Sequence, residues 1–241
     1  GEAHPRQLDE RFGSKRVVNA WGGWSRETKQ TLESLHRRGL LRVARRQKGI
    51  RVYTPAPEPA DIDLETRFRN VLTTTVRVLA PVLESSLAGI LAPVRRRRGL
   101  DARAARRIAD GLVASGELER IETGGAHYLV PANLRAAGPP SRVVRFLAPF
   151  DPVVWDRDRF ERLWGWPYRF EAYTPRAKRV RGYYAMPMLW GDDVIGWANV
   201  DNTGDSLDVE VGYAKSKPRS TAFARELEAE IERMRAFLAG Q

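Results

Sequence analysis

The sequence predicts an α+β protein, in which two tandem helix-and-hairpin domains precede a C-terminal antiparallel β-rich domain with a terminal helix. One observation behind this prediction is a repeat. Twice a basic helix ends at a glycine and runs directly into two short strands, over Ser25–Tyr53 and again over Asp101–Leu129. The other observation is the change to strand-like alternation in the last part of the chain. Two matched units are far less expected by chance than one, and their shape is that of a winged helix.

The first copy is defined by its punctuating residues. We expect Ser25 to cap a helix over residues 26–38 that ends at Gly39. Residues 40–46 and 50–54 then pair around the turn Gln47-Lys48-Gly49. A short helix over residues 7–12 and a loop over residues 13–23 come before them. Helical spacing turns Thr28, Leu32 and Leu35 toward the core and leaves the charged residues outward.

The second copy begins with a helix over residues 64–80, whose apolar stripe contains Phe68, Val71, Leu72, Val76 and Leu79. A second helix over residues 84–94 is expected to stop at a run of four arginines, residues 95–98. Asp101 then caps a third helix, which Gly116 ends. Residues 117–123 pair with residues 126–130 around Gly124-Gly125.

The last part of the chain reads as a small antiparallel sheet. Alternation over residues 168–173 and 207–213 predicts two strands, and Gly191-Asp192-Asp193 is expected to turn a hairpin between residues 182–190 and 194–200. A terminal helix over residues 219–238 presents an apolar stripe that is expected to cover one face of the sheet.

Charge is concentrated in the two repeated units. The chain carries a formal net charge of +11, and residues 1–142 hold 26 Lys and Arg against 15 Asp and Glu, whereas residues 143–241 hold 15 of each. A surface that binds a polyanion produces such a field, and a merely solubilising surface is the alternative. Combined with the repeat, the charge favours double-stranded DNA as the partner. The predicted DNA-binding residues are Arg26, Lys29, Gln30, Arg45, Arg46, Lys48, Arg51, Arg95, Arg96, Arg97, Arg98, Arg103, Arg106, Arg107, Lys178, Arg179 and Arg181.

Proline-rich connectors mark the domain boundaries. Residues 55–59 and the segment around Gly138-Pro139-Pro140 divide the chain into winged helices at 1–57 and 58–140 and a β-rich scaffold domain at 141–241. No apolar run approaches the roughly 20 residues of a membrane span, so we expect a cytoplasmic protein. The chain has no cysteine and three scattered histidines, so we expect no disulfide, no metal and no cofactor. We also expect a monomer.

Several sequence runs are more specific than these patterns. They are LAPFDPVVWDR at 147–157, RLWGWPY at 162–168, PRAKR at 175–179, GYY at 182–184, WGGWS at 21–25, GLLRVARR at 39–46 and RVY at 51–53. These runs resemble the YcaQ-like family of tandem winged-helix DNA glycosylases, which unhook DNA interstrand crosslinks and remove alkylated bases. The resemblance begins near Gln7 and implies the second and third winged helices of a typical member with its C-terminal β-rich domain.

The resemblance leaves the catalytic residues unknown. In that family a Gln-x-Gln or Gln-x-Asp motif lies in the N-terminal winged helix, which we expect to be absent from this sequence. Gln7-Leu8-Asp9 has the same letters but opens a later winged helix, so we expect a chance match. Asp151 and Asp156 are possible substitutes, but we expect Asp151 to form a turn and Asp156 to cap a helix. Aromatic residues are expected to build the core between sheet and helix rather than to stack on bases: Trp155, Trp164, Trp166, Tyr183 and Tyr184.

Three function classes follow. The first is a DNA-binding fragment or short homologue of a repair glycosylase, a hydrolase of N-glycosidic bonds. The second is a winged-helix transcription regulator, which predicts dimers and sequence-specific binding. The third is a scaffold whose arginines meet an acidic protein.

Overall fold

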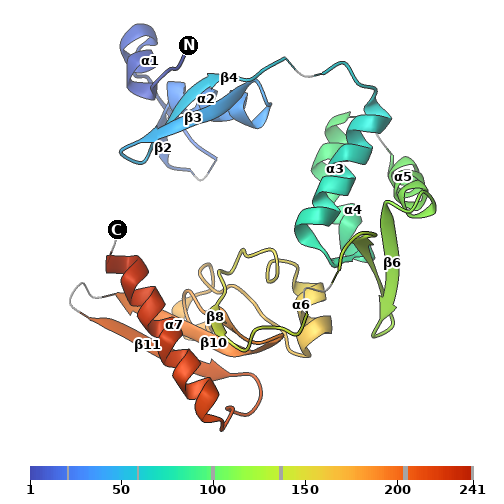
Figure 1. Ribbon diagram of the computed structural model, residues 1–241. Coiled ribbons are helices and arrows are strands. Elements are labelled where there is room, and N and C mark those ends of the chain that lie inside the picture. The colour runs from blue at the N-terminus through green and yellow to red at the C-terminus, as the bar shows by residue number, and fades with distance from the viewer. Residues whose placement is uncertain (21, 59, 99–100, 136–137, 203–205, 240–241) are drawn as a thin grey trace. The chain divides into compact units, whose positions relative to one another are not determined.

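The computed structural model describes residues 1–20, 22–58, 60–98, 101–135, 138–202 and 206–239, and of residues 95–98 and 102 it describes the backbone alone. The chain divides into two compact units, residues 1–62 and residues 63–241. Both units combine helices with antiparallel strands, and the chain ends in a helix (Figure 1). The predicted α+β class is therefore confirmed.

The first unit holds two helices and two hairpins. Its elements are α1 (Pro5–Phe12), β1 (Arg16–Val18), β2 (Trp24–Arg26), α2 (Glu27–Arg37), β3 (Leu41–Gln47) and β4 (Ile50–Pro55). Strands β3 and β4 form the predicted hairpin, and both residues of its turn, Lys48 and Gly49, have positive φ (50° and 77°). Leu32 of α2 is buried, as are Val52 and Tyr53 of β4, so helix and hairpin share a small core.

The prediction that Ser25 caps α2 is wrong. Ser25 lies in β2, which pairs with β1, and β1 lies inside the segment 13–23 that was predicted to be a loop. Arg26 occupies the N-cap position and makes no side-chain capping bond. The Ser25 hydroxyl instead accepts a hydrogen bond from Gln30 Nε2 at 3.0 Å. The backbone at Ser25 is thus paired with strand β1. A capping pattern depends only on residues that are neighbours in the sequence, so it does not show this pairing.

The second unit opens with three helices and a three-stranded sheet. Its first elements are α3 (Leu64–Leu79), β5 (Val82–Leu83), α4 (Glu84–Arg98), α5 (Ala102–Ala114), β6 (Leu118–Thr123) and β7 (Ala126–Pro131). The strands are antiparallel in the order β5-β7-β6. The predicted stripe of α3 is confirmed, because Phe68, Leu72 and Val76 are buried in one core with residues of the other two helices and the sheet. Asp101 caps α5 as predicted, accepting a hydrogen bond from Ala104 N at 2.6 Å.

Helix α4 is longer than predicted. It continues through Arg98 instead of stopping at Val94, with Pro93 inside it. Arginine is among the better helix formers, so a run of arginines is a weaker stop signal than a glycine.

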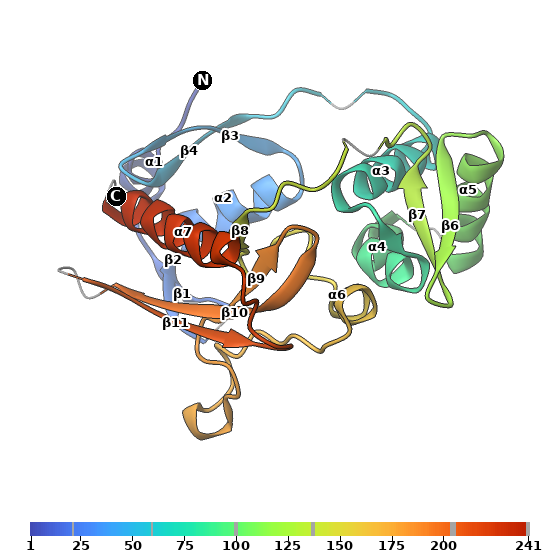
Figure 2. The same ribbon diagram turned by 60° about the horizontal axis from the view of Figure 1, so that its bottom comes forward.

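The rest of the second unit is a four-stranded antiparallel sheet in the order β11-β10-β9-β8, crossed by the terminal helix. Its elements are β8 (Val144–Phe146), α6 (Arg157–Trp164), the 3-10 helix η1 (Arg176–Lys178), β9 (Met186–Trp190), β10 (Asp193–Asn202), β11 (Leu207–Tyr213) and α7 (Thr221–Ala239). Helix α7 covers one face of the sheet, as predicted (Figure 2). Phe223 of α7 is buried there against the rings of Trp190 and Tyr213.

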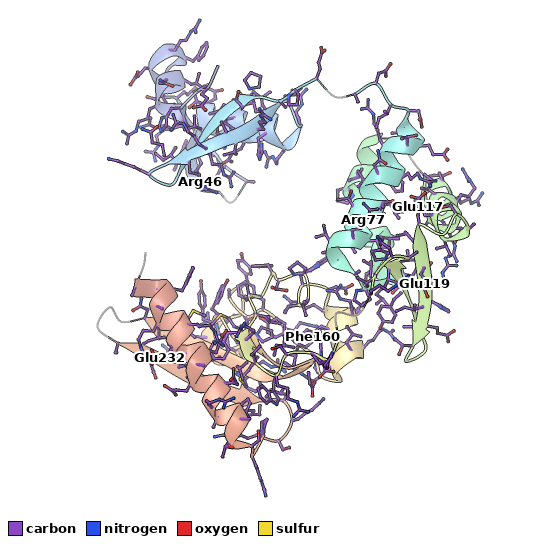
Figure 3. All side chains as sticks on the ribbon, in the orientation of Figure 1. Arg46, Arg77, Glu117, Glu119, Phe160 and Glu232 are labelled. Atoms are coloured by element: carbon purple, nitrogen blue, oxygen red, sulfur yellow. The ribbon has the colours of Figure 1, made fainter. Side chains whose placement is uncertain are left out.

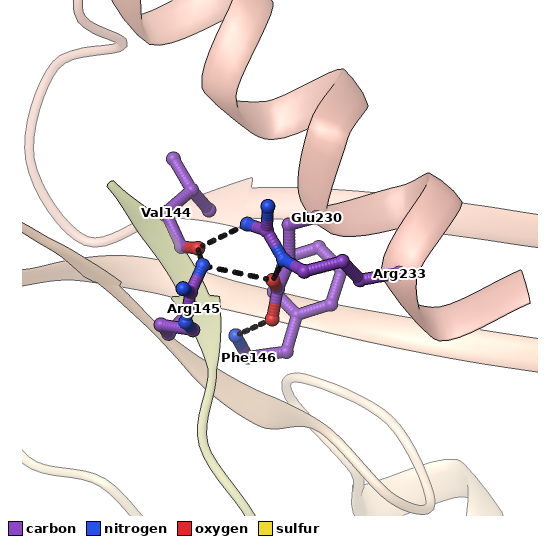
Figure 4. A network of polar contacts seen from close by, with 5 residues as sticks. All are labelled: Val144, Arg145, Phe146, Glu230 and Arg233. Atoms are coloured by element: carbon purple, nitrogen blue, oxygen red, sulfur yellow. Dashed lines mark hydrogen bonds and ion pairs between the residues drawn. The ribbon is translucent and has the colours of Figure 1, made fainter. Parts of the chain in front are cut away.

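A buried carboxylate fastens α7 to the edge strand β8 (Figure 4). Glu230 accepts hydrogen bonds from the Phe146 backbone N–H at 2.7 Å and from Arg233 Nε at 2.8 Å, and Arg145 Nη1 lies 3.4 Å away. Arg145 and Arg233 both donate to the Val144 carbonyl, at 2.8 and 3.1 Å. Because β8 is the edge of the sheet, this network gives partners to backbone groups that no further strand reaches.

Helix α6 is fastened to the segment between α3 and β5. The buried guanidinium of Arg159 donates to the carbonyl oxygens of Leu79, Pro81 and Pro152. This one side chain therefore ties the helical part of the second unit to the part that carries the four-stranded sheet.

The strand predicted over residues 168–173 is wrong, because this segment folds into a loop. Tyr168 is buried and its hydroxyl donates to the Ala185 carbonyl at 2.7 Å. Glu171 is also buried and accepts from the backbone N–H groups of three successive residues, 180–182, at 2.8–3.1 Å. Burial alone raises the pKa of Glu171, but these three hydrogen bonds bring it below its usual value. Tyr168 and Glu171 are three residues apart and both face inward, whereas in a regular strand residues three apart point to opposite faces.

Candidate nucleic-acid interface

A groove of about 470 Å³ in the first unit gathers predicted contacts from α2 and from the β3–β4 hairpin. Four of the seven contacts predicted for this unit line it: Arg26, Lys29, Arg46 and Arg51. The hairpin register explains this convergence, because Arg46 lies directly opposite Arg51 and cross-strand partners share one face. Tyr53 lies two residues after Arg51 in β4, so its side chain points to the same face of the hairpin. Tyr53 is buried and packs this face against the rest of the unit.

Three of these cations are available to an anion. Lys29, Arg46 and Arg51 make no ion pair with any carboxylate in the described part of the chain. The Arg46 guanidinium donates to the Gly49 carbonyl at 3.1 Å, which holds it near the tip of the hairpin (Figure 3). Like charges directly opposite each other are unfavourable in a hairpin. A bound anion between them relieves that repulsion, and a phosphate has the charge to do so.

Arg26, by contrast, is neutralised within the fold. Its guanidinium and the Thr28 hydroxyl both donate to the buried carboxylate of Asp9. These bonds, that of Thr28 first and that of Arg26 next, hold the pKa of Asp9 below its ordinary value of 3.8. The Asp9 carboxylate is therefore ionised and ties α1 to the start of α2. Gln7 has its own structural role, since its Oε1 accepts from His4 N at 2.9 Å in the capping box of α1.

The other predicted contacts of the first unit lie outside this groove. Gln30 donates its amide hydrogens to the Val18 carbonyl and to Ser25, each at 3.0 Å. Arg45 is on the opposite face of the hairpin, where it pairs with Glu2 at 2.8 Å. Lys48 is exposed in the turn. The sequence thus placed these residues on one helix and one hairpin, but it did not show which of their side chains meet.

Helix α5 presents the predicted arginine face in the second unit. Arg103, Arg106 and Arg107 are exposed, while Ile108 and Leu112 of the same helix are buried. Within the described residues, Arg103 and Arg107 have no carboxylate partner, and Arg106 lies 3.9 Å from Asp110.

Arg106 also lines a second groove, of about 630 Å³, between α4, α5 and the turn of the β6–β7 hairpin. His127 of the hairpin and Arg162 of α6 line it too, above apolar side chains that include Leu87 and Leu91. Cationic and imidazole groups therefore converge on one side of α5.

The four-arginine run is only partly described. The backbone of Arg95, Arg96, Arg97 and Arg98 belongs to α4, but their side chains lie outside the described residues, as does Trp21 of the run WGGWS. Their contact with DNA stays a prediction.

The predicted contacts of the C-terminal part sit in the loop between α6 and β9. Lys178 is exposed, and Arg179 donates to the Thr174 carbonyl at 2.8 Å with its guanidinium 4.9 Å from the centre of the Tyr183 ring. Arg181 is half-buried, with its guanidinium 5.2 and 5.3 Å from the rings of Trp166 and Trp197. Arg181 therefore holds the loop against the sheet, and Arg179, also half-buried, packs within the loop itself, whereas Lys178 is exposed.

The two aspartates considered as catalytic substitutes have the structural roles predicted for them. Asp151 accepts from Val153 N at 2.8 Å in a turn. Asp156 is buried as the N-cap of α6 and accepts from Arg159 N at 3.2 Å. Each carboxylate already serves the local backbone.

The prediction that the aromatic residues build the core is confirmed for some of them and wrong for others. Trp166 is buried, with its indole N–H donating to the Val194 carbonyl at 2.7 Å, and Trp164 packs on Phe160, so the core prediction is confirmed for them. It is wrong for Tyr183 and Tyr184, which are exposed because they precede the strand that begins at Met186. The sequence signal that marks them is the interleaving of aromatic and basic residues over residues 169–184.

Two other kinds of feature are absent from the part of the chain that the structure describes. No three or more His, Asp or Glu side chains there are grouped so that they could hold a metal ion. No helix described is both long and apolar enough to span a bilayer.

Comparison with known proteins places the chain in a family. Among solved structures none matches it. The family model described as DNA glycosylase AlkZ-like matches residues 1–237, which include both units and the cationic surfaces described above. The match confirms the predicted resemblance to a DNA glycosylase family and makes DNA the expected partner. The chain belongs to the AlkZ-like DNA glycosylase family.

Proposed function

We propose that this chain binds double-stranded DNA through the groove of its first unit and the arginine face of α5, as the DNA-holding part of a repair glycosylase. The substrate class that we propose is DNA with alkylated or crosslinked bases. The groove carries the proposal, because Lys29, Arg46 and Arg51 converge on it and pair with no carboxylate of the described residues. Each phosphate that such cations neutralise releases condensed counterions, which drives binding.

We also infer that both units contain a winged helix. In the second unit the order α3-β5-α4-α5-β6-β7, with its sheet order β5-β7-β6, supports this inference. In the first unit α2 runs into the β3–β4 hairpin in the same way. Winged helices place the helix before the hairpin against DNA, and α2 and α5 hold that position here. Their outward cations include Lys29 on α2 and Arg103 on α5.

The family match favours repair over the transcription-regulator alternative. Cleavage of an N-glycosidic bond needs a polar group that positions water and stabilises positive charge on the sugar. Asp9, Asp151 and Asp156 are each engaged in hydrogen bonds that hold the fold, so we assign none of them this role.

The test compares two variants in salt-dependent binding to a labelled duplex. Arg46→Gln/Arg51→Gln removes two groove cations and is expected to weaken binding to all sequences alike. It should lower the slope of log K against log salt by about 1.8, or about 0.9 for each phosphate that is no longer neutralised. The control is Arg42→Gln, which removes one positive charge from the other face of the hairpin, where Arg42 lies opposite Thr54.

A slope that does not change in the double variant, or that falls by about 0.9 in the control, would contradict the assignment of the groove. Circular dichroism of each variant checks that the unit is folded.

A further inference from the structure

A surface in the second unit combines exposed aromatic rings with positive charge. Phe170 is in edge contact with three rings around it: Phe150 at 5.1 Å, Tyr184 at 5.4 Å and Tyr173 at 6.1 Å between centroids. Three of these four rings are strongly exposed: Phe150 at 65%, Tyr173 at 85% and Tyr184 at 45%. Tyr183, next along the chain, is 59% exposed. Together these five residues form what we call the Phe170 surface.

The backbone that carries this surface is fixed by buried contacts. The Glu171 carboxylate gathers the amides of residues 180–182, and Asn199 of β10 donates to the Arg181 carbonyl at 2.6 Å. The Arg181 guanidinium lies near two tryptophan rings. Tyr168 is buried below, and this burial raises the pKa of its hydroxyl to about 12. The rings are therefore exposed on a loop whose backbone is held in place by buried contacts, and their exposure does not result from poor packing of the loop.

The same loop is strongly basic. Residues 169–184 carry five cations against one acid, and that acid is the enclosed Glu171. The cations are Arg169, Arg176, Lys178, Arg179 and Arg181. Arg179 lies over the Tyr183 ring, so charge and aromatic face meet in one place. Exposed rings flanked by cations match a ligand that is flat and apolar on one part and anionic on another.

We propose that the Phe170 surface is a stacking site for unpaired bases of DNA, such as those of an opened or extruded stretch beside a lesion. Proteins hold unpaired nucleic acid by stacking bases on aromatic side chains while cations follow the backbone, and every base offers a ring face for this. In a paired duplex the base faces are stacked on one another, so the surface discriminates open from closed DNA. The inference rests on the proposed function, because it names the form of DNA that this part of the chain prefers.

The experiment compares a fully paired duplex with one that has an unpaired stretch of three nucleotides in its centre, at equal salt. Removing two ring faces, in Tyr173→Ala/Tyr183→Ala, is expected to weaken binding to the open duplex about tenfold or more and to leave paired-duplex binding within about twofold. Tyr173→Phe/Tyr183→Phe keeps the rings and is expected to keep the preference. The matched control is Phe237→Ala, which removes a ring of similar exposure (62%) from α7.

A 2-aminopurine base in the open stretch gives a second readout, since stacking on a tyrosine quenches its fluorescence. Loss of that quenching in the alanine variant supports the site. Equal affinity of the unmodified chain for open and paired duplex overturns the inference, as does an equal loss in Phe237→Ala.

The two proposals fail separately. If the chain binds a paired duplex with the salt dependence expected of the groove but shows no preference for open DNA, only the stacking site falls. If neither duplex binds, the proposed function falls, and the stacking site with it.

Discussion

Replacing Glu230 by alanine should destabilise the second unit more than any exposed charge change on the same helix. Glu230 is 6% exposed and is the acceptor for the Phe146 backbone N–H at the edge of the four-stranded sheet. The substitution leaves that N–H without a partner and removes the carboxylate between Arg145 and Arg233 (Figure 4).

The expected cost can be assembled from these contacts. An unsatisfied buried donor costs about 1–3 kcal/mol. The side chains of Arg145 and Arg233 are 44% and 43% exposed, so water replaces much of what they lose, and each ion pair contributes at most about 1 kcal/mol. The free energy of unfolding should therefore fall by about 2–4 kcal/mol. At about 2–4 °C per kcal/mol for a unit of this size, the expected fall in Tm is about 4–16 °C.

Differential scanning calorimetry measures this, with Glu232→Ala as the control. Glu232 lies on the same helix (Figure 3). Its side chain is 58% exposed and forms a surface pair with Arg235, so its removal should cost less than about 0.5 kcal/mol. Glu230→Gln keeps an acceptor for the Phe146 N–H and should fall between the two. Equal shifts for Glu230→Ala and Glu232→Ala would refute the reasoning that the edge strand depends on this carboxylate.

Three other contacts lead to testable expectations. Because the pKa of Asp9 is lowered in the folded state, Asp9 stabilises the first unit at pH values above the ordinary aspartate pKa, and this stability is lost as the pH falls through the folded value. In Asp9→Asn the free energy of unfolding should therefore fall less steeply as the pH is lowered. An unchanged pH dependence would contradict the bonds to Thr28 and Arg26. Leu72→Ala, in the fully buried stripe of α3, should cost about 3–5 kcal/mol in urea unfolding, against less than about 0.5 kcal/mol for Val78→Ala on the exposed side of that helix. Arg103→Gln/Arg107→Gln should lower the salt slope of duplex binding by about 1.8 without changing Tm, and an unaltered slope would remove α5 from the interface.

Local chemistry was readable wherever the deciding residues are neighbours in the chain. The turns at Lys48-Gly49 and Gly124-Gly125 require positive φ, and the residues that allow it showed where both hairpins turn. Asp101 caps α5 through an amide three residues away, and the apolar spacing of α3 and α7 showed which faces are buried. The sequence by itself therefore determined the α+β class, both hairpins, most of the helices, and the cationic character of residues 1–142.

Tertiary structure decided the rest, because the partners there are far apart in sequence. Arg51 became a groove residue through its register with Arg46, while Arg45, next to Arg46, was turned to the other face and paired with Glu2. The guanidinium of Arg181 packs near the rings of two tryptophans, whereas Tyr183 is exposed to solvent. A side chain's type fixes what it is able to bind, but the fold fixes whether a neighbour from elsewhere in the chain has already satisfied it.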